Sequence, residues 1–292
     1  PSPPPRYLGR SSVHASAEAG PVALATSLSP RGGAAQRRAI SSWSGFGATL
    51  ISVNTAEEIA QLAPDYPEVE FREATRDGRD LIGKPLVYID DLLAALASTD
   101  APSCGILNAD ILLLDGAQLA RDIAASGGAL TICHRLNIES ADDRDGAVYL
   151  PGFDAFFFPR AEIARLKGSR MLLGAPWWDY LFAALATISG LPLRIPERTA
   201  IGHVVHRVNW SPRMYVVAAA LWLEALRAAA AAAPQPLPPP ARFLAPLLEA
   251  YARHHRLVGE IDDATVGDER LSQSLAMLLT LVNHVVRTQA TP

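Results

Sequence analysis

Cysteine and long apolar runs are both scarce in this chain of 292 residues. Cys104 and Cys133 are its only cysteines, which excludes a disulfide framework. Each lies in an apolar, strand-like run, so we expect two buried free thiols. No uninterrupted apolar run reaches the ~18 residues of a membrane span, and the first ten residues lack a basic segment followed by an apolar one, as a secretory signal would have. We therefore expect a cytoplasmic protein that does not span a membrane.

Excess charge and several common motifs are also missing. The chain has 26 basic and 30 acidic residues, a formal net charge of −4, which argues against a broad grip on nucleic acid but allows a local pocket for a small anion. It has no Gly-x-x-x-x-Gly-Lys-Ser/Thr phosphate loop, no Gly-x-Gly-x-x-Gly after a strand and no Gly-x-Ser-x-Gly elbow. These absences count against P-loop kinases, Rossmann dehydrogenases and α/β-hydrolases.

What is present is an alternation of strand-like and helix-like segments. Residues 1–35 are rich in proline, serine, glycine and alanine, and we expect a flexible leader there. From residue 36 to 212, buried apolar strands such as 48–54 and 104–107 alternate with amphipathic helices. This pattern predicts an α/β domain with a mainly parallel sheet flanked by helices, whose ligands gather at the carboxyl ends of the strands.

Residues 213–292 have a different character. An alanine-rich helical segment, a proline-dense break and two amphipathic helical segments follow one another. We expect an α-helical C-terminal extension. Its apolar faces suit either packing on the chain's own core or a homodimer.

One strand-like run ends in Asn108-Ala109-Asp110, which places an amide and a carboxylate at a strand end. This resembles the Asp-x-Asp position of GT-A fold nucleotide-sugar glycosyltransferases, of the family 2-like kind, over about residues 36–212. The resemblance implies a GT-A-like (Rossmann-like) fold and transfer of a sugar from a nucleotide-diphosphate donor to an acceptor hydroxyl. It also implies Mg²⁺ or Mn²⁺ at Asp110. Asn108 replaces the first Asp, and its amide can still contact a ribose hydroxyl or a metal-bound water.

The same resemblance assigns the donor's nucleotide to the first half of the domain. It implies that Val53, Asn54 and Thr55 border the base and ribose, and that Arg72 or Lys84 is available to the base or the diphosphate. From the residues alone, an equally good interpretation is that these positions are ordinary strand-end caps and solvated charges.

A second cluster of interest combines aromatic and acidic side chains. Trp177 and Trp178 could form a platform for a sugar ring, and Asp179 could take the proton of the acceptor hydroxyl. In the alternative reading, both tryptophans fill the core and Asp179 caps a helix. Asp154 lies in an aromatic strand and needs a partner, either Arg160 or backbone amides, unless it faces the acceptor pocket beside Asp179.

His203 and His206 are spaced three residues apart. Such side chains share a face on a helix but roughly oppose each other on a strand, so the backbone decides whether they can act together. GT-A enzymes often complete their metal site with a late histidine, and the resemblance implies that one of the two joins Asp110. A hydrogen-bonded core histidine is the alternative. A zinc hydrolase is disfavoured, because no acidic residue lies between the histidines.

Three functions therefore remain in view. The first is an NDP-sugar dependent, hexosyltransferase-like glycosyltransferase acting on a saccharide or another hydroxyl acceptor. The second is a nucleotidyltransferase on a related fold, distinguished by release of pyrophosphate. The third is a non-catalytic scaffold on a degenerate GT-A domain, suggested by Asn108 and by the helical extension.

Overall fold

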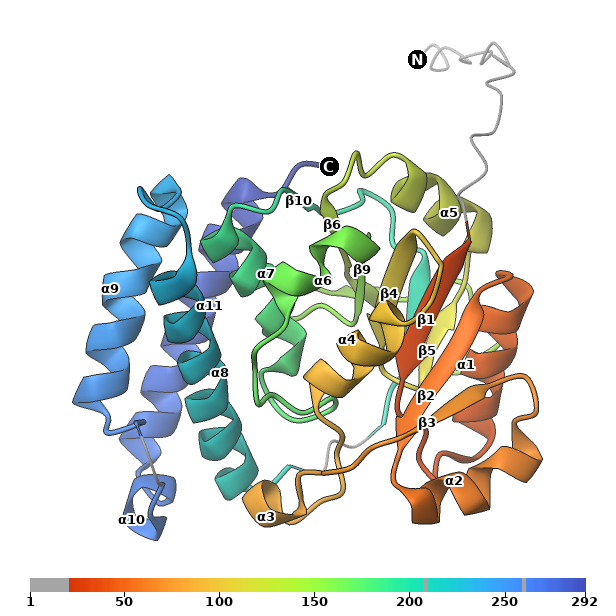
Figure 1. Cartoon of the computed structure of the whole chain (residues 1–292), viewed down its shortest axis with the longest axis horizontal. Helices are drawn as coiled ribbons and strands as arrows, with labels where there is room; N and C mark the ends of the chain where they lie inside the picture. The colour runs from red at the N-terminus through yellow and green to blue at the C-terminus, as the bar shows by residue number, and fades with distance from the viewer. Residues whose placement is uncertain (1–20, 207–209, 259–260) are drawn as a thin grey trace, which may run out of the picture.

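The computed structural model describes residues 21–206, 210–258 and 261–292, and a seven-stranded sheet lies at its centre (Figure 1). The strand order is β10-β6-β9-β4-β1-β2-β3. The neighbours pair in parallel except for β9, which is antiparallel to both β4 and β6. The strands are β1 (Val22–Thr26), β2 (Thr49–Asn54), β3 (Glu70–Glu73), β4 (Ser103–Leu107), β6 (Leu130–Cys133), β9 (Ala155–Pro159) and β10 (Leu193–Arg194).

Buried side chains cover both faces of this sheet, because successive residues of a strand point to opposite sides. Leu24 and Leu50 belong to a cluster with residues of α1 and α5, whereas Ala25 and Ile51 belong to a cluster with α4 and α7. The helices before the C-terminal region are α1 (Gly33–Gly45), α2 (Ala56–Leu62), α3 (Arg79–Ile82), α4 (Ile89–Ala97), α5 (Gly116–Ala124), α6 (Ile163–Leu166) and α7 (Trp178–Ser189).

A second, four-stranded sheet has the order β5-β11-β7-β8. Its strands are β5 (Ile111–Leu113), β7 (Arg135–Ile138), β8 (Ala147–Tyr149) and β11 (Ile201–Val204). Helix α1 holds its edge strand β5, because Trp43 Nε1 donates to the carbonyl of Ile111 at 2.7 Å and Ser42 Oγ accepts from the amide of Leu113 at 3.0 Å. This sheet is tied to the main one through the short turn between β4 and β5.

The C-terminal helices are α8 (Pro212–Ala232), α9 (Pro239–His254), α10 (Asp263–Val266) and α11 (Glu269–Gln289). The predicted helical extension is confirmed, and it shares one core with the sheet: Leu226, Leu244 and Leu278 lie in the same buried cluster as Ile51 and Ile106. Within the described residues, α8 alone is long and apolar enough to cross a membrane by length and composition. In its most apolar window 61% is buried inside the fold, as in a core helix.

The predicted leader is wrong for residues 22–35. Strand β1 lies in the middle of the main sheet between β2 and β4, and α1 begins at Gly33. The short sequence Val-Ala-Leu-Ala-Thr, set among proline, serine and glycine, carried too weak a pattern to be read as a strand. Residues 1–20 lie outside the described residues. The strand predicted at 48–54 is therefore the second one, β2.

The predicted α/β class is confirmed. The structure is an α/β protein with a mainly parallel sheet flanked by helices. Cys104 and Cys133 are buried free thiols, as expected. Burial raises the pKa of Cys104 to about 11 and that of Cys133 to about 12, so both are structural at neutral pH.

Candidate functional site

Asp110 lies in the turn that joins β4 to β5. Thr26 Oγ1 donates to the carbonyl of Leu107 at 2.8 Å and so ties the carboxyl end of β4 to β1. The amide of Ile111 donates to the carbonyl of Asn108 at 3.2 Å and closes the turn. Asp110 is thereby fixed at the carboxyl edge of the parallel strands, where ligands of such sheets bind.

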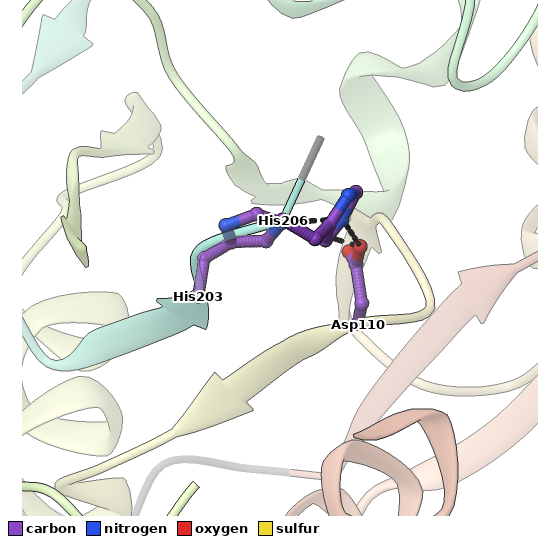
Figure 2. Close-up of side chains that lie close together, drawn as sticks. All are labelled: Asp110, His203 and His206. Atoms are coloured by element: carbon purple, nitrogen blue, oxygen red, sulfur yellow. Dashed lines mark hydrogen bonds and ion pairs between the residues drawn. The ribbon is translucent and has the colours of Figure 1, made fainter. Parts of the chain in front are cut away.

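Both late histidines reach Asp110 (Figure 2). The antiparallel register of β11 and β5 places His203 opposite Ile111, next to Asp110. His206 lies beyond the end of β11, so the opposition expected within a strand does not apply to it. The Nε2 atoms of His203 and His206 are 3.3 and 3.1 Å from Asp110 Oδ2, and 3.2 Å from each other.

These three residues suit a metal ion. Two ligand atoms bound about 2.0–2.2 Å from one ion at about 90–110° are roughly 2.8–3.6 Å apart, and the triangle of 3.1–3.3 Å falls within that range. Asp110 Oδ1 and His203 Nδ1 are buried and have no hydrogen-bond partner among the described residues. Burial would raise the pKa of Asp110, but the hydrogen bonds and charges of His203 and His206 lower it to about 2, so the carboxylate is ionised at neutral pH.

The triangle opens into a cavity of about 570 Å³. Its size is within the range of small-molecule sites. The walls come from the loop after β1, the β4–β5 turn, the small sheet and the starts of α7 and α8. The lining residues are Ser29, Arg31, Gly32, Ala35, Gln36, Lys84, Leu86, Asn108, Ala109, Asp110, Arg135, Tyr149, Asp154, Gly174, Trp178, Asp179, His203, His206, Trp210 and Met214.

Besides Arg135, two cationic side chains line this cavity, one from the loop after β1 and one from the loop before α4. Lys84, one of the predicted candidates, is among them. Arg31 was missed, because the segment that carries it was taken for a leader. Its side chain is exposed. Arg72 does not line the cavity and pairs instead with Glu70 on β3.

Val53, Asn54 and Thr55 do not line the cavity either. Val53 is 2% exposed and lies in the core. The side chain of Asn54 is buried and donates to the carbonyl of Leu28 at 2.7 Å, which fixes the loop after β1. Thr55 forms a capping box with Glu58 at the start of α2. These three residues therefore stabilise the ends of the strands. The loop after β1 forms the part of the cavity wall that they were expected to form.

The two adjacent tryptophans are both buried, at 2% and 3% exposed, but only one of them lines the cavity. Trp177 has a left-handed backbone (φ 74°) at the start of α7 and is buried against Tyr215 and Trp222, with ring centroids 5.3 and 5.4 Å away. It does not line the cavity, so the predicted platform is wrong for Trp177. Trp178 does line it. Trp210, half exposed, also lines the cavity and was missed.

Asp154 pairs with Arg135 and not with Arg160. Asp154 is 3% exposed. The guanidinium of Arg135 also lies over the ring of Tyr149, 4.2 Å from the ring centroid. Burial raises the pKa of Asp154 against the opposing charge of Arg135. Asp154 is therefore paired internally, by Arg135 where Arg160 was expected, and it also lines the cavity together with Asp179. Its place in an acceptor pocket stays a prediction.

Asp179 lies in the first turn of α7, with its carboxylate against the backbone of Gly152. A Cβ atom at Gly152 would be 2.4 Å from Asp179 Oδ2, so only glycine allows this approach. Burial, followed by the negative charge of Asp154, raises the pKa of Asp179 well above its usual value. Perturbed acids in a cavity are typical of catalytic sites.

Comparison with known proteins gives structural neighbours of low identity. The mannosyltransferase PcManGT from Pyrobaculum calidifontis, solved with GDP-Man and Mn²⁺, is 14% identical with a TM-score of 0.49, covering 92% of this chain and 86% of that one. HddC from Yersinia pseudotuberculosis is 12% identical with a TM-score of 0.34, covering 63% and 88%. No family model and no curated protein matches the chain. We interpret the site from its own residues.

Proposed function

We propose that this protein transfers a sugar from a nucleotide-diphosphate-sugar donor to an acceptor hydroxyl, with the help of a divalent metal ion. One observation carries the proposal: a possible metal site and two cationic side chains line the same cavity. The metal site is formed by Asp110, His203 and His206, and the cations are Arg31 and Lys84. A diphosphate needs both a metal ion and cationic side chains to balance its charge.

Asp110, His203 and His206 would hold the metal ion, which when bound neutralises the charge that develops on the departing diphosphate. Arg31 and Lys84 would contact the phosphate oxygens. The amide of Asn108, beside Asp110 in the same turn, would contact a ribose hydroxyl. Imidazole ligands favour transition metals, whereas Mg²⁺ prefers oxygen ligands. Of the two ions expected from the sequence, Mg²⁺ and Mn²⁺, the two histidines therefore favour Mn²⁺.

The opposite side of the cavity would bind the acceptor. In the transfer step, the acceptor oxygen bonds to the anomeric carbon while the bond from that carbon to the diphosphate oxygen breaks. Asp179 would receive the proton of the acceptor hydroxyl, and its raised pKa makes the ionised carboxylate a stronger base than that of an exposed aspartate. Trp178 would contact the apolar face of a sugar ring, and the Arg135–Asp154 pair would hydrogen-bond its hydroxyls.

A thermal-shift screen tests this proposal. UDP, GDP, CDP and dTDP are each added with and without Mn²⁺ to the wild-type chain, to Asp110→Ala and to Asp100→Ala. Asp100 is exposed and lies before β4, outside the cavity, so it serves as the matched control. We expect a Mn²⁺-dependent rise in Tm with one nucleotide, kept in Asp100→Ala and lost in Asp110→Ala. No shift with any nucleotide would overturn the proposal.

The products then separate the proposed reaction from its alternatives. Incubation with the sugar form of the selected nucleotide should release nucleoside diphosphate. Release of pyrophosphate from a sugar phosphate and a nucleoside triphosphate would instead identify a nucleotidyltransferase. Tight nucleotide binding without any turnover would identify a scaffold on this fold.

A further inference from the structure

Residues 149–152, which we call the acceptor wall, run from the cavity toward α11, where Leu150 and Pro151 line a separate hollow with Asn283 and Arg287. At one end, Tyr149 lines the cavity and carries the guanidinium of Arg135 on its ring. At the other end, Gly152 lies against the carboxylate of Asp179. A shift of this wall would therefore move the surroundings of Asp179 and the face on which an acceptor rests.

Helix α11 holds the middle of the acceptor wall. Arg287 Nη2 donates to the carbonyl of Leu150, and Asn283 Nδ2 lies 3.5 Å from the carbonyl of Pro151. Arg287 Nε donates to Asn283 Oδ1 at 3.2 Å, so the two side chains, one helical turn apart, act as a unit. The helix itself packs on α7, the helix that begins beside Asp179 (Figure 1).

Two further side chains, from outside α11, hold the same stretch. The hydroxyl of Tyr180 donates to the carbonyl of Pro151. His134 Nδ1 lies 3.0 Å from the carbonyl of Gly152. All three carbonyls of residues 150–152 thus have side-chain partners, and those of residues 150 and 151 have partners from α11.

The placement of Arg287 is specific to this wall. Among the described residues it has no carboxylate partner, and its contacts are the Leu150 carbonyl, Asn283 and the face of Phe153, 5.6 Å from the ring centroid. Because the guanidinium of Arg287 is charged, its hydrogen bond to the Leu150 carbonyl is stronger than a bond between two neutral groups. Helix α11 therefore makes polar contacts with residues 150 and 151 of the acceptor wall.

We propose that Arg287 and Asn283 of α11 are positioning residues that set the acceptor site by holding the acceptor wall against Asp179. This inference rests on the proposed function. It assigns the C-terminal helices a part in acceptor binding, through the wall and without contact with the metal site.

Hydrogen exchange measured by mass spectrometry tests the wall without knowledge of the acceptor. The full chain is compared with Arg287→Met, Arg287→Lys and Arg270→Met. Arg270 is an exposed arginine of the same helix and provides the matched control. We expect exchange in peptides covering 149–154 to rise about tenfold or more in Arg287→Met, the effect of losing a hydrogen bond to a charged group. Exchange should stay near wild type in Arg287→Lys and in Arg270→Met.

Kinetics then test the consequence for the reaction. In Arg287→Met we expect the KM for the acceptor to rise about tenfold, with the KM for the donor and the Mn²⁺-dependent nucleotide shift unchanged, and recovery in Arg287→Lys. Exchange that rises evenly over the whole chain, or an unchanged acceptor KM, would overturn the inference. Absence of any nucleotide shift in the wild type would instead overturn the proposed function and the acceptor role with it, while the exchange result would still show whether α11 holds the wall.

Discussion

At the scale of single residues, the donor set around Asp110 combines one carboxylate with two imidazoles. The carboxylate is partly shielded, with 34% of the side chain exposed, while His203 is 11% and His206 57% exposed. One ligand is therefore fixed inside the fold and one lies at the cavity mouth. Such a mixed set should distinguish among divalent ions, which an all-carboxylate site does less well.

We expect the chain to bind Mn²⁺ more tightly than Mg²⁺, and His203→Ala to weaken Mn²⁺ binding by about 100-fold or more. Loss of a direct ligand should exceed the roughly 10–100-fold effect of losing a ligand's supporting hydrogen bond. Titration followed by the electron paramagnetic resonance signal of free Mn²⁺ measures this directly. His284→Ala, which changes an exposed histidine of α11, is the control. Equal affinity for the two ions, or normal Mn²⁺ binding by His203→Ala, would contradict the assignment.

A second prediction at this scale concerns the stability of the chain and not its activity. The pKa of Asp179 is raised in the folded state, so folding loses stability as pH rises from the ordinary pKa of an aspartate through this higher value. Asp179→Asn removes the ionisation. We expect it to raise Tm at pH 8 by about 2–4 °C, the shift produced by about 1 kcal/mol, and to leave Tm nearly unchanged at pH 4.

Thermal melts at the two pH values check this expectation. Asp100→Asn, at an exposed position, should change Tm little at either pH. An equal gain for Asp179→Asn at both pH values would mean that packing, and not ionisation, accounts for it. A gain in stability together with a loss of transfer would be the usual opposition of stability and function at a catalytic site.

At the scale of secondary-structure elements, much of the candidate site depends on strands that were not predicted. The strands at 48–54 and 104–107 were read correctly, because each is a continuous apolar run of the kind found in strands buried on both faces. The small sheet was missed, since three or four residues such as those of β5 and β11 give almost no periodic signal. Asp110 and the two histidines were still named as candidates, because a strand end and an unusual pair of histidines are visible without the sheet that joins them.

The site residues that do not line the cavity, or that were missed, have two causes. Because β1 was missed, the residues after β2 were taken to border the ligand, whereas Asn54 is used to fix the loop after β1. Arg31 on that loop was missed for the same reason. The buried position of Trp177 depends on a left-handed backbone and on contact with Trp222, more than forty residues later in the chain. Such a contact leaves no local trace in the sequence.

The third prediction concerns β11, which carries His203. A Cβ atom at Gly202 would lie 2.8 Å from Leu114 Cδ1 and 3.0 Å from Ile138 Cδ1, so this strand can approach its neighbours only with glycine. Gly202→Ala should destabilise the fold by about 1–3 kcal/mol through overpacking. It should also displace His203 and weaken Mn²⁺ binding.

Thermal melts and Mn²⁺ titration of Gly202→Ala are compared with Gly45→Ala. A Cβ atom at Gly45, in α1, meets no atom within 4 Å, so this variant makes the same chemical change without a clash. Wild-type Mn²⁺ affinity in a folded Gly202→Ala chain would show that the position of β11 does not govern the metal site.

At the scale of the whole molecule, the helical extension and the sheet are joined by a single core. Trp222 of α8 is fully buried and packs against Trp177, which directly precedes Trp178 and Asp179. The extension thus supports the start of α7 from behind, while α11 holds the acceptor wall. We therefore expect the two parts to unfold together, although the sequence divides at about residue 212 in composition.

Scanning calorimetry of Trp222→Ala tests this unity. Truncation of a buried tryptophan removes about 3–5 kcal/mol, which corresponds to a drop in Tm of roughly 6–20 °C for a chain of this size. If one core serves both parts, the variant melts in a single transition whose calorimetric and van't Hoff enthalpies agree, as in the wild type. Phe243→Ala, at a half-exposed aromatic position of α9, should lower Tm much less.

Two separate transitions, with only one of them shifted by Trp222→Ala, would mean that residues 213–292 form a domain of their own. The support of Asp179 by α8 would then have to come from an interface between domains and not from a common core.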